Sequence, residues 1–323
     1  MIKQLILLIC LMLGGSACQR APSPLDAKGQ SKKKKDQQRT VAQVSETYGP
    51  PVKLADLEER AVNESSGLAA SRTSPGLYWT HNDSDNGPFI YAFDSKGARR
   101  GVWRVTGAVS RDWEDIAAGP GPKPGASYLY IGDTGDNSGR RAEIIVYRVP
   151  EPLIEASSVT SSKLRPLVTE PAEAIRLRYP DGEHDAEALL VHPTSGKIYI
   201  VTKVAFENPS IYEFDSIAGT DSPTTLTRVG QLNVQSLFGG IITGGAISPD
   251  GQRVALCDLF QGYELALPGA NTPFDEIWKQ PLKTVYLGKR KQGESITYRL
   301  DGKALLATSE GLPAPLIEVV RKQ

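Results

Sequence analysis

Short apolar segments recur along residues 60–320, and each is followed by a turn and a second apolar segment. The turns contain Gly, Pro or Asp-Gly, which favour tight connections between antiparallel strands. The pattern therefore predicts a series of hairpins. The five segment pairs are 66–70 with 77–80, 114–118 with 128–131, 187–191 with 198–201, 245–249 with 254–257, and 294–298 with 304–307.

A third and a fourth strand follow most of these hairpins. Four strands in a unit of about fifty residues are typical of a β-propeller. The fifth unit lacks its fourth strand, and residues 52–54 can supply it, so that an N-terminal strand closes the ring and leaves no open edge. We predict an all-β propeller of five four-stranded blades; the stretches 150–174 and 216–242 leave room for a sixth, and a β-sandwich or a two-domain β protein is the alternative. The third strands are expected at 90–93, 146–149, 211–214, 263–265 and 316–319, and the other fourth strands at 102–105, 175–178, 226–229 and 284–287.

The N-terminal residues form an export signal rather than part of the fold. Lys3 precedes an apolar run at 5–13, and small residues lead to Cys18. This order resembles a bacterial lipoprotein signal, which implies a lipidated Cys18 and a membrane anchor; Gln19 implies the outer membrane, facing the periplasm. An ordinary secretory signal is the alternative. We expect a signal peptide at 1–17, the lipidated cysteine with a flexible polar tether at 18–48, and a single propeller domain at 49–323.

Composition excludes several classes of protein. The chain has 37 basic and 37 acidic residues, so it lacks the basic surplus that nucleic-acid binding requires. Three cysteines, one of them inside the signal, cannot form a disulfide framework.

Acidic residues recur where the first strand of a blade begins and where the second ends. Because these two strands are antiparallel, both positions lie at the same mouth of the central channel. The first-strand starts are Ser66, Glu114, Glu187, Gly245 and Glu294, with Glu64, Asp112 and Asp185 two residues earlier. The second-strand ends carry the predicted binding residues Asn82, Asp83, Asp133, Lys203, Asp258 and Glu310, to which Asp112 and Asp185 are added.

A ring of carboxylates needs compensation, because nearby like charges raise one another's pKa. A bound cation supplies it, and oxygen-only ligands suit calcium better than zinc. We therefore predict a calcium site at this mouth. The alternative is that these acids bond to backbone amides and to Arg or Lys neighbours.

Two histidines lie beside the predicted mouth. If the protein is an enzyme, His81 or His184 is the candidate general base acting on a metal-oriented water. The alternative is that both only form structural hydrogen bonds.

Five motifs stand out in the sequence: Trp-Thr-His-Asn-Asp-Ser at 79–84, Asp-Trp-Glu-Asp-Ile-Ala at 112–117, Gly-Asp-Thr-Gly-Asp-Asn at 132–137, Tyr-Arg-Val-Pro-Glu-Pro at 147–152 and Asp-Ala-Glu-Ala-Leu at 185–189. Together they resemble a group of secreted bacterial β-propeller proteins, most of them uncharacterised. The chain is more remotely similar to calcium-dependent propeller hydrolases of the paraoxonase and gluconolactonase type and to esterase-like propellers related to phytase. That resemblance implies axial calcium, with Glu114, Glu187 and Glu294 as ligands, and hydrolysis of a lactone, ester or phosphoester.

Two functions follow from these patterns. The first is a cell-envelope binding or scaffold module that holds a small molecule or a protein at an acidic, calcium-binding mouth. The second is a calcium-dependent hydrolase. The two hypotheses differ in whether the molecule at the mouth is bound or turned over.

Overall fold

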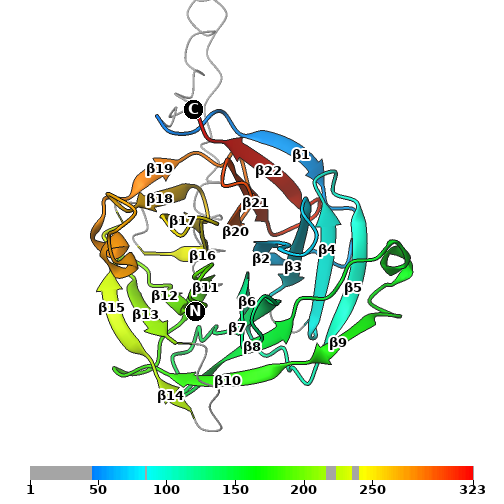
Figure 1. Ribbon diagram of the computed structural model, residues 1–323, viewed down its shortest axis with the longest axis horizontal. Coiled ribbons are helices and arrows are strands. Elements are labelled where there is room, and N and C mark those ends of the chain that lie inside the picture. The colour runs from blue at the N-terminus through cyan, green and yellow to red at the C-terminus, as the bar shows by residue number, and fades with distance from the viewer. Residues whose placement is uncertain (1–45, 84–85, 216–222, 235–239, 323) are drawn as a thin grey trace, which may run out of the picture. The chain divides into compact units, whose positions relative to one another are not determined.

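The strands form a five-bladed β-propeller, as Figure 1 shows. The computed structural model describes residues 46–83, 86–215, 223–234 and 240–322. The predicted signal peptide, Cys18 and nearly all of the tether lie outside these residues. The inner strands β2 (Ser65–Ala70), β6 (Trp113–Pro120), β11 (Ala186–Val191), β16 (Ile242–Ile247) and β20 (Gly293–Tyr298) contact one another in this order, and β20 returns to β2.

The four main strands of each blade are antiparallel, which confirms the predicted fold. They run outward in chain order in blades 1 to 4, whereas in blade 5 the N-terminal strand takes the outermost place. In blades 1 and 2 the further strands are β3 (Leu77–Asn82), β4 (Phe89–Asp94) and β5 (Arg99–Thr106), and β7 (Ser127–Asp133), β8 (Ile144–Pro150) and β10 (Glu173–Arg178). In blades 3 and 4 they are β12 (Ile198–Thr202), β13 (Ser210–Phe214) and β15 (Thr227–Gln231), and β17 (Arg253–Asp258), β18 (Gly262–Ala266) and β19 (Lys283–Val285). Blade 5 contains β21 (Ala304–Ser309), β22 (Pro315–Val320) and β1 (Val52–Asp56).

The stretches that left room for a sixth blade extend existing blades instead. β9 (Leu167–Pro171) pairs in parallel with β5, and β14 (Thr224–Thr225) pairs in parallel with β10. Two short 3-10 helices, η1 (Ala156–Thr160) and η2 (Phe274–Lys279), lie between outer strands. Within the described residues, the sheets therefore number five.

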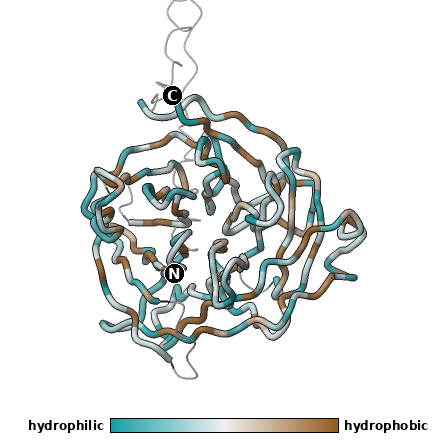
Figure 2. The backbone as a smooth tube through the Cα atoms, in the orientation of Figure 1, coloured by the Kyte–Doolittle hydropathy of each residue, from teal (hydrophilic) through white to brown (hydrophobic). Residues whose placement is uncertain are grey.

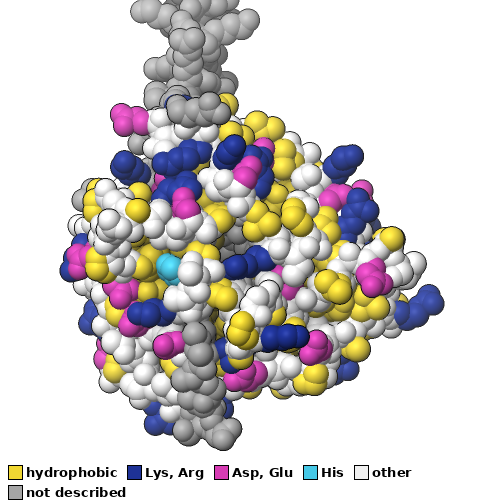
Figure 3. Space-filling view, viewed as in Figure 1, with side chains coloured by type: hydrophobic (Ala, Val, Ile, Leu, Met, Phe, Trp, Pro, Cys, Tyr) yellow, Lys and Arg dark blue, Asp and Glu magenta, His cyan; other side chains and the backbone are white. Residues whose placement is uncertain are grey.

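Hydrophobic side chains fill the spaces between neighbouring blades. Figure 2 shows hydrophobic stretches along the strands of every blade. Between blades 1 and 2, Trp79 and Trp113 are fully buried, and Trp79 meets Trp103 edge to face with ring centroids 5.0 Å apart. Burial of such large rings contributes much of the stability of a core. On the face seen in Figure 3, acidic and basic side chains are interspersed with hydrophobic ones. No helix of the described residues is long and apolar enough to span a membrane.

The N-terminal strand closes the ring, as the sequence predicts. β1 pairs antiparallel with β22, and Tyr48 forms a further bridge with Arg321. Main-chain bonds therefore join the two ends of the described domain. Gly49 donates its N–H to the Val320 carbonyl at 2.8 Å, and Lys322 donates to Thr47 at 2.9 Å.

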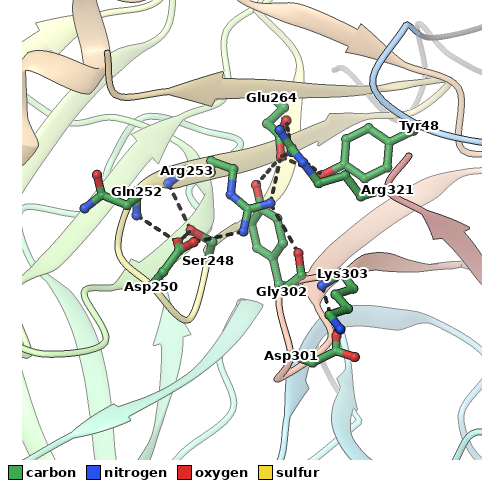
Figure 4. A network of polar contacts seen from close by, with 11 residues as sticks. Tyr48, Ser248, Asp250, Gln252, Arg253, Glu264, Asp301, Gly302, Lys303 and Arg321 are labelled. Atoms are coloured by element: carbon green, nitrogen blue, oxygen red, sulfur yellow. Dashed lines mark hydrogen bonds and ion pairs between the residues drawn. The ribbon is translucent and has the colours of Figure 1, made fainter. Parts of the chain in front are cut away.

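A buried carboxylate holds this closure to blade 4. Glu264 is 3% exposed and accepts hydrogen bonds from Tyr48 at 2.6 Å, Tyr298 at 2.9 Å and Arg321 at 2.8 Å (Figure 4). Arg253 lies 3.9 Å from the same carboxylate. Several donors are needed because a buried charge is costly unless it is paired and hydrogen-bonded. Glu264 thus ties both ends of the described domain to one blade.

Replacing Glu264 with Gln should destabilise the propeller by about 2 kcal/mol, because its partners lose charge-assisted hydrogen bonds in a buried site. Urea unfolding of the variant measures this loss. The control is Glu318→Gln, which removes a more exposed ion pair with Arg299 and should cost less than about 1 kcal/mol. Equal effects of the two substitutions would contradict a special role for Glu264.

Candidate functional site

A β-bulge recurs near the start of four inner strands. In β6, Trp113 faces Asp133 and Asp115 faces Gly132, so Glu114 is the extra residue. A bulge re-aims the side chain of its extra residue, and bulges are common near binding sites. The equivalent extra residues are Glu187 in β11, Thr243 in β16 and Glu294 in β20.

This register corrects one sequence-based expectation. Gly245 was expected at the first-strand start of blade 4, but β16 begins at Ile242 and its bulge residue is Thr243. Gly245 lies further along the strand, opposite Leu256. The position equivalent to the three glutamates is therefore occupied by a hydroxyl in blade 4. The Thr243 hydroxyl donates to the Gly293 carbonyl of blade 5 at 2.8 Å.

Lys203 is the positive charge on which carboxylates of neighbouring blades converge. Its side chain is 13% exposed and forms an ion pair with Glu187. Its charge also acts to lower the pKa of Glu114, Asp185 and Glu294, against the effect of burial. One ammonium group thus interacts with acids of blades 2, 3 and 5.

Three carboxylates gather beside this position. Asp83, Asp112 and Glu114 offer oxygen atoms that all lie within 4.8 Å of one another. The same space leaves no room for a side chain at residue 135, because a Cβ on Gly135 would overlap the carboxylates of both Glu114 and Asp112. We call Asp83, Asp112 and Glu114 the acid cluster.

Two acids of the acid cluster, Asp112 and Glu114, hold their protons more tightly than isolated carboxylic acids do. Burial, together with the charges of Asp83 and Asp185, raises the pKa of Asp112 to about 6. Burial also raises the pKa of Glu114 well above its usual value. Nearby, burial raises the pKa of Glu294 to about 7 even though Lys203 opposes the shift. The positive charge at this end of the channel therefore does not offset the effect of burial on these carboxylates.

Two carboxylates beside Lys203 retain oxygen atoms without a hydrogen-bond partner. Asp185 accepts a bond from the Asp136 N–H at 2.7 Å through Oδ1, while its buried Oδ2 is unpartnered. Glu187 is 4% exposed, and its Oε2 is likewise unpartnered although the other oxygen meets Lys203. Both atoms are acceptors that the described residues leave unused.

The residues predicted at the second-strand ends fall into two sets, according to whether they are the last residue of the strand or follow it. Asn82, Asp133 and Asp258 are the last residues of the second strands, whereas Asp83, Lys203 and Glu310 each follow such a strand by one residue. Because successive side chains of a strand alternate in direction, the two sets differ in surroundings.

The side chains of the first set stabilise the loops near these strand ends through hydrogen bonds and an ion pair. Asp133 forms a 2.7 Å ion pair with Arg141, and Asn82 donates to the Ala61 carbonyl at 2.6 Å. Asp258 accepts bonds from two loop amides and from the Tyr263 hydroxyl. In the second set, the backbone amides of Asp83, Lys203 and Glu310 donate to Glu64, Asp185 and Gln292, respectively.

The two candidate bases lie in different surroundings. His81 is completely buried, packs edge to face on Trp113, and has Nδ1 2.8 Å from the Asn82 carbonyl oxygen. Burial lowers the pKa of His81, which the charge of Asp83 partly opposes. His184 is paired with Asp181 and with the Tyr212 hydroxyl, both at 3.0 Å. The imidazole contacts therefore do not bring either ring into the acid cluster.

Sequence reasoning missed Asp115, which joins three inner strands. Its buried carboxylate accepts hydrogen bonds from the Ile116 N–H at 2.8 Å, the Leu189 N–H at 3.0 Å and the Gly245 N–H at 3.2 Å. Its place next to Glu114 was visible in the sequence, but only the bulge separates the roles of the two acids.

Replacing Lys203 with Met should destabilise the protein by about 3 kcal/mol at pH 7.5, because Glu187 loses its partner in a buried pair. The loss should be smaller at pH 5, where Glu114 and Glu294 are protonated in the folded protein. Urea unfolding at both pH values tests this.

The matched control for that substitution is Lys197→Met, which removes a more exposed pair with Glu213. Its effect should be about 1 kcal/mol or less and nearly the same at both pH values. A pH-independent effect of Lys203→Met would show that Lys203 does not control the ionisation of these acids.

Comparison with known proteins adds little. No protein-family model and no curated protein matches the chain. One solved structure with a similar arrangement is a chain of a crystal structure of a mitotic checkpoint complex, with 11% sequence identity and a TM-score of 0.38. The match covers 79% of this chain and 61% of that chain, so less than two thirds of the latter is spanned. A likeness of this degree carries no argument about function.

Proposed function

We propose that the protein is a lipid-anchored cell-envelope module whose propeller binds a small molecule or a protein at a calcium-loaded mouth. The observation that carries this proposal is the acid cluster, where Asp83, Asp112 and Glu114 lie close enough to share one cation. The anchor at Cys18 is proposed from the sequence alone, since that residue lies outside the described part of the chain.

The chemistry of the cluster fits calcium. Its donors are carboxylate oxygens, which hard cations prefer. A divalent cation would also relieve the repulsion that raises the pKa of Asp112 and Glu114. The unpartnered Oε2 of Glu187 and Oδ2 of Asp185 are further acceptors near Lys203. Of the three ligands expected from the sequence, Glu114 belongs to the cluster, whereas Glu187 is paired with Lys203.

A binding role follows from where the cluster lies. Asp83 and Asp112 are only partly buried, so a cation there would be accessible from the channel mouth. Calcium accepts six to eight oxygen ligands, more than three carboxylates supply when each contributes one atom. A bound partner can provide the missing oxygens. Hydrolysis gains no specific support, because neither histidine belongs to the acid cluster: His81 Nδ1 lies 2.8 Å from the Asn82 carbonyl oxygen, and His184 Nε2 pairs with Asp181.

Calcium should raise the melting temperature of the full-length protein by several degrees at pH 7.5, because a ligand that binds only the folded state stabilises it. Thermal unfolding with calcium and with EDTA measures the effect. Asp112→Asn combined with Glu114→Gln should abolish the response, while the surface control Glu276→Gln should retain it. An identical melting temperature with calcium and with EDTA would overturn the proposal.

The metal-free protein should lose stability as pH rises from 5 to 7.5. Asp112 and Glu294 have raised pKa values of about 6 and about 7 when folded, so the folded state holds protons that the unfolded chain has released. This stabilisation is complete below about pH 4 and disappears as pH passes the folded pKa values. Urea unfolding in EDTA should show the decline, and saturating calcium should reduce it. A flat profile in EDTA would contradict the assigned shifts.

A further inference from the structure

A second cavity lies where the inner strands approach the hairpin turns, at the end of the channel opposite the acid cluster. Its volume is about 280 Å³, and all five inner strands contribute to its wall. The strands end here at Ala70, Pro120, Val191, Ile247 and Tyr298, whereas Glu114, Glu187 and Glu294 lie near the strand starts.

Small apolar side chains create this space. Ala69 and Ala70 of blade 1, Ala117 and Ala118 of blade 2, and Ala246 of blade 4 line it, where larger residues would fill it. Polar and apolar atoms contribute comparably to the cavity wall, and these alanine side chains supply part of the apolar share. The present cavity is therefore suited to the apolar part of a small molecule.

Among the residues that the structure describes, Arg72 is the one charged residue that lines the cavity. Its guanidinium extends from the turn of blade 1 to blade 3, where Nη1 and Nη2 donate to the Pro193 carbonyl at 3.2 and 3.3 Å. A guanidinium carries five N–H donors, so donors remain beyond these two bonds. Arg72 is exposed, so these remaining donors are accessible to a ligand from solvent.

The carboxylate nearest to Arg72 is already engaged. Glu151 accepts hydrogen bonds from the Ser71 hydroxyl at 2.6 Å, the Trp79 indole at 3.0 Å and the Arg72 backbone N–H at 3.2 Å. Glu151 also interacts favourably with the Arg72 charge through space. Within the described residues, Glu151 bonds the backbone N–H of Arg72 and not its guanidinium, so the guanidinium can pair with a second anion.

We propose that this cavity binds a small monocarboxylic acid with a short aliphatic or single-ring body. The body lies among the alanines of the inner strands, and the carboxylate pairs with the Arg72 guanidinium. Arginine suits this role because its planar donors match a carboxylate. This site is separate from the acid cluster and needs no metal.

Isothermal titration of the full-length protein with hexanoate, and with the neutral analogue hexanamide, tests the proposal. Hexanoate should bind saturably and at least about tenfold more tightly than hexanamide, because only the acid forms charge-assisted bonds. Arg72→Gln should remove this preference. The control Arg104→Gln, at an exposed arginine of β5, should bind hexanoate as the unmodified protein does.

Filling the cavity provides a second test. Ala246→Leu should abolish hexanoate binding, whereas Glu114→Gln at the other end of the channel should leave it unchanged. Thermal unfolding shows whether the Ala246→Leu variant is folded. If it is not, hexanoate binding by the Arg72→Gln variant tests the proposal alone. No saturable binding at millimolar hexanoate, equal affinity for hexanamide, or undiminished binding by Arg72→Gln would overturn the proposal.

Discussion

Five inner strands converge on one axis. Their backbone N–H and C=O groups need hydrogen-bond partners there, although no continuous ladder of backbone hydrogen bonds joins one blade to the next. Polar side chains provide the missing partners. Asp115 accepts amide hydrogens from β11 and β16, and Ser66 donates to the Glu114 carbonyl of the next blade at 2.6 Å. Thr134 makes the equivalent contact with Ala186 at 2.7 Å. These contacts fix the spacing of the inner strands, on which both ends of the channel depend.

The bulges explain why charge accumulates at one end. Each bulge interrupts a ladder and presents its extra residue, and in three blades that residue is a glutamate. One such glutamate would have little effect in a single sheet. Because the glutamate recurs around the ring, several carboxylates lie at the same end of the channel. Lys203 offsets part of the charge, yet Asp112 and Glu294 still have raised pKa values. The folded protein therefore holds protons at these two carboxylates to a higher pH than the unfolded chain does.

The strand repeat and the ring closure were predictable because they depend on local signals. Alternating apolar residues and Gly or Pro turns identify hairpins, and the absent fourth strand of the last unit indicated β1. The site was less predictable because a bulge shifts register by one residue, which no local signal marked. In blade 4 the bulge lies at Thr243, two residues before Gly245, so a hydroxyl occupies the position equivalent to the glutamates. The bulge in β6 also distinguished Asp115 from Glu114, although the two are adjacent.

The same repetition gives the two ends of the channel different chemistry. All inner strands run in one direction, so residues at equivalent register positions share an end of the ring. Acids near the strand starts favour cations, while alanines near the strand ends leave an apolar space with Arg72 beside it. Asp115 follows Glu114 and bonds the amides of Ile116 and Gly245, which line that space. These hydrogen bonds fix the cavity wall next to the acidic end of the channel. The two ends of the channel therefore share one set of strands and still differ in chemistry.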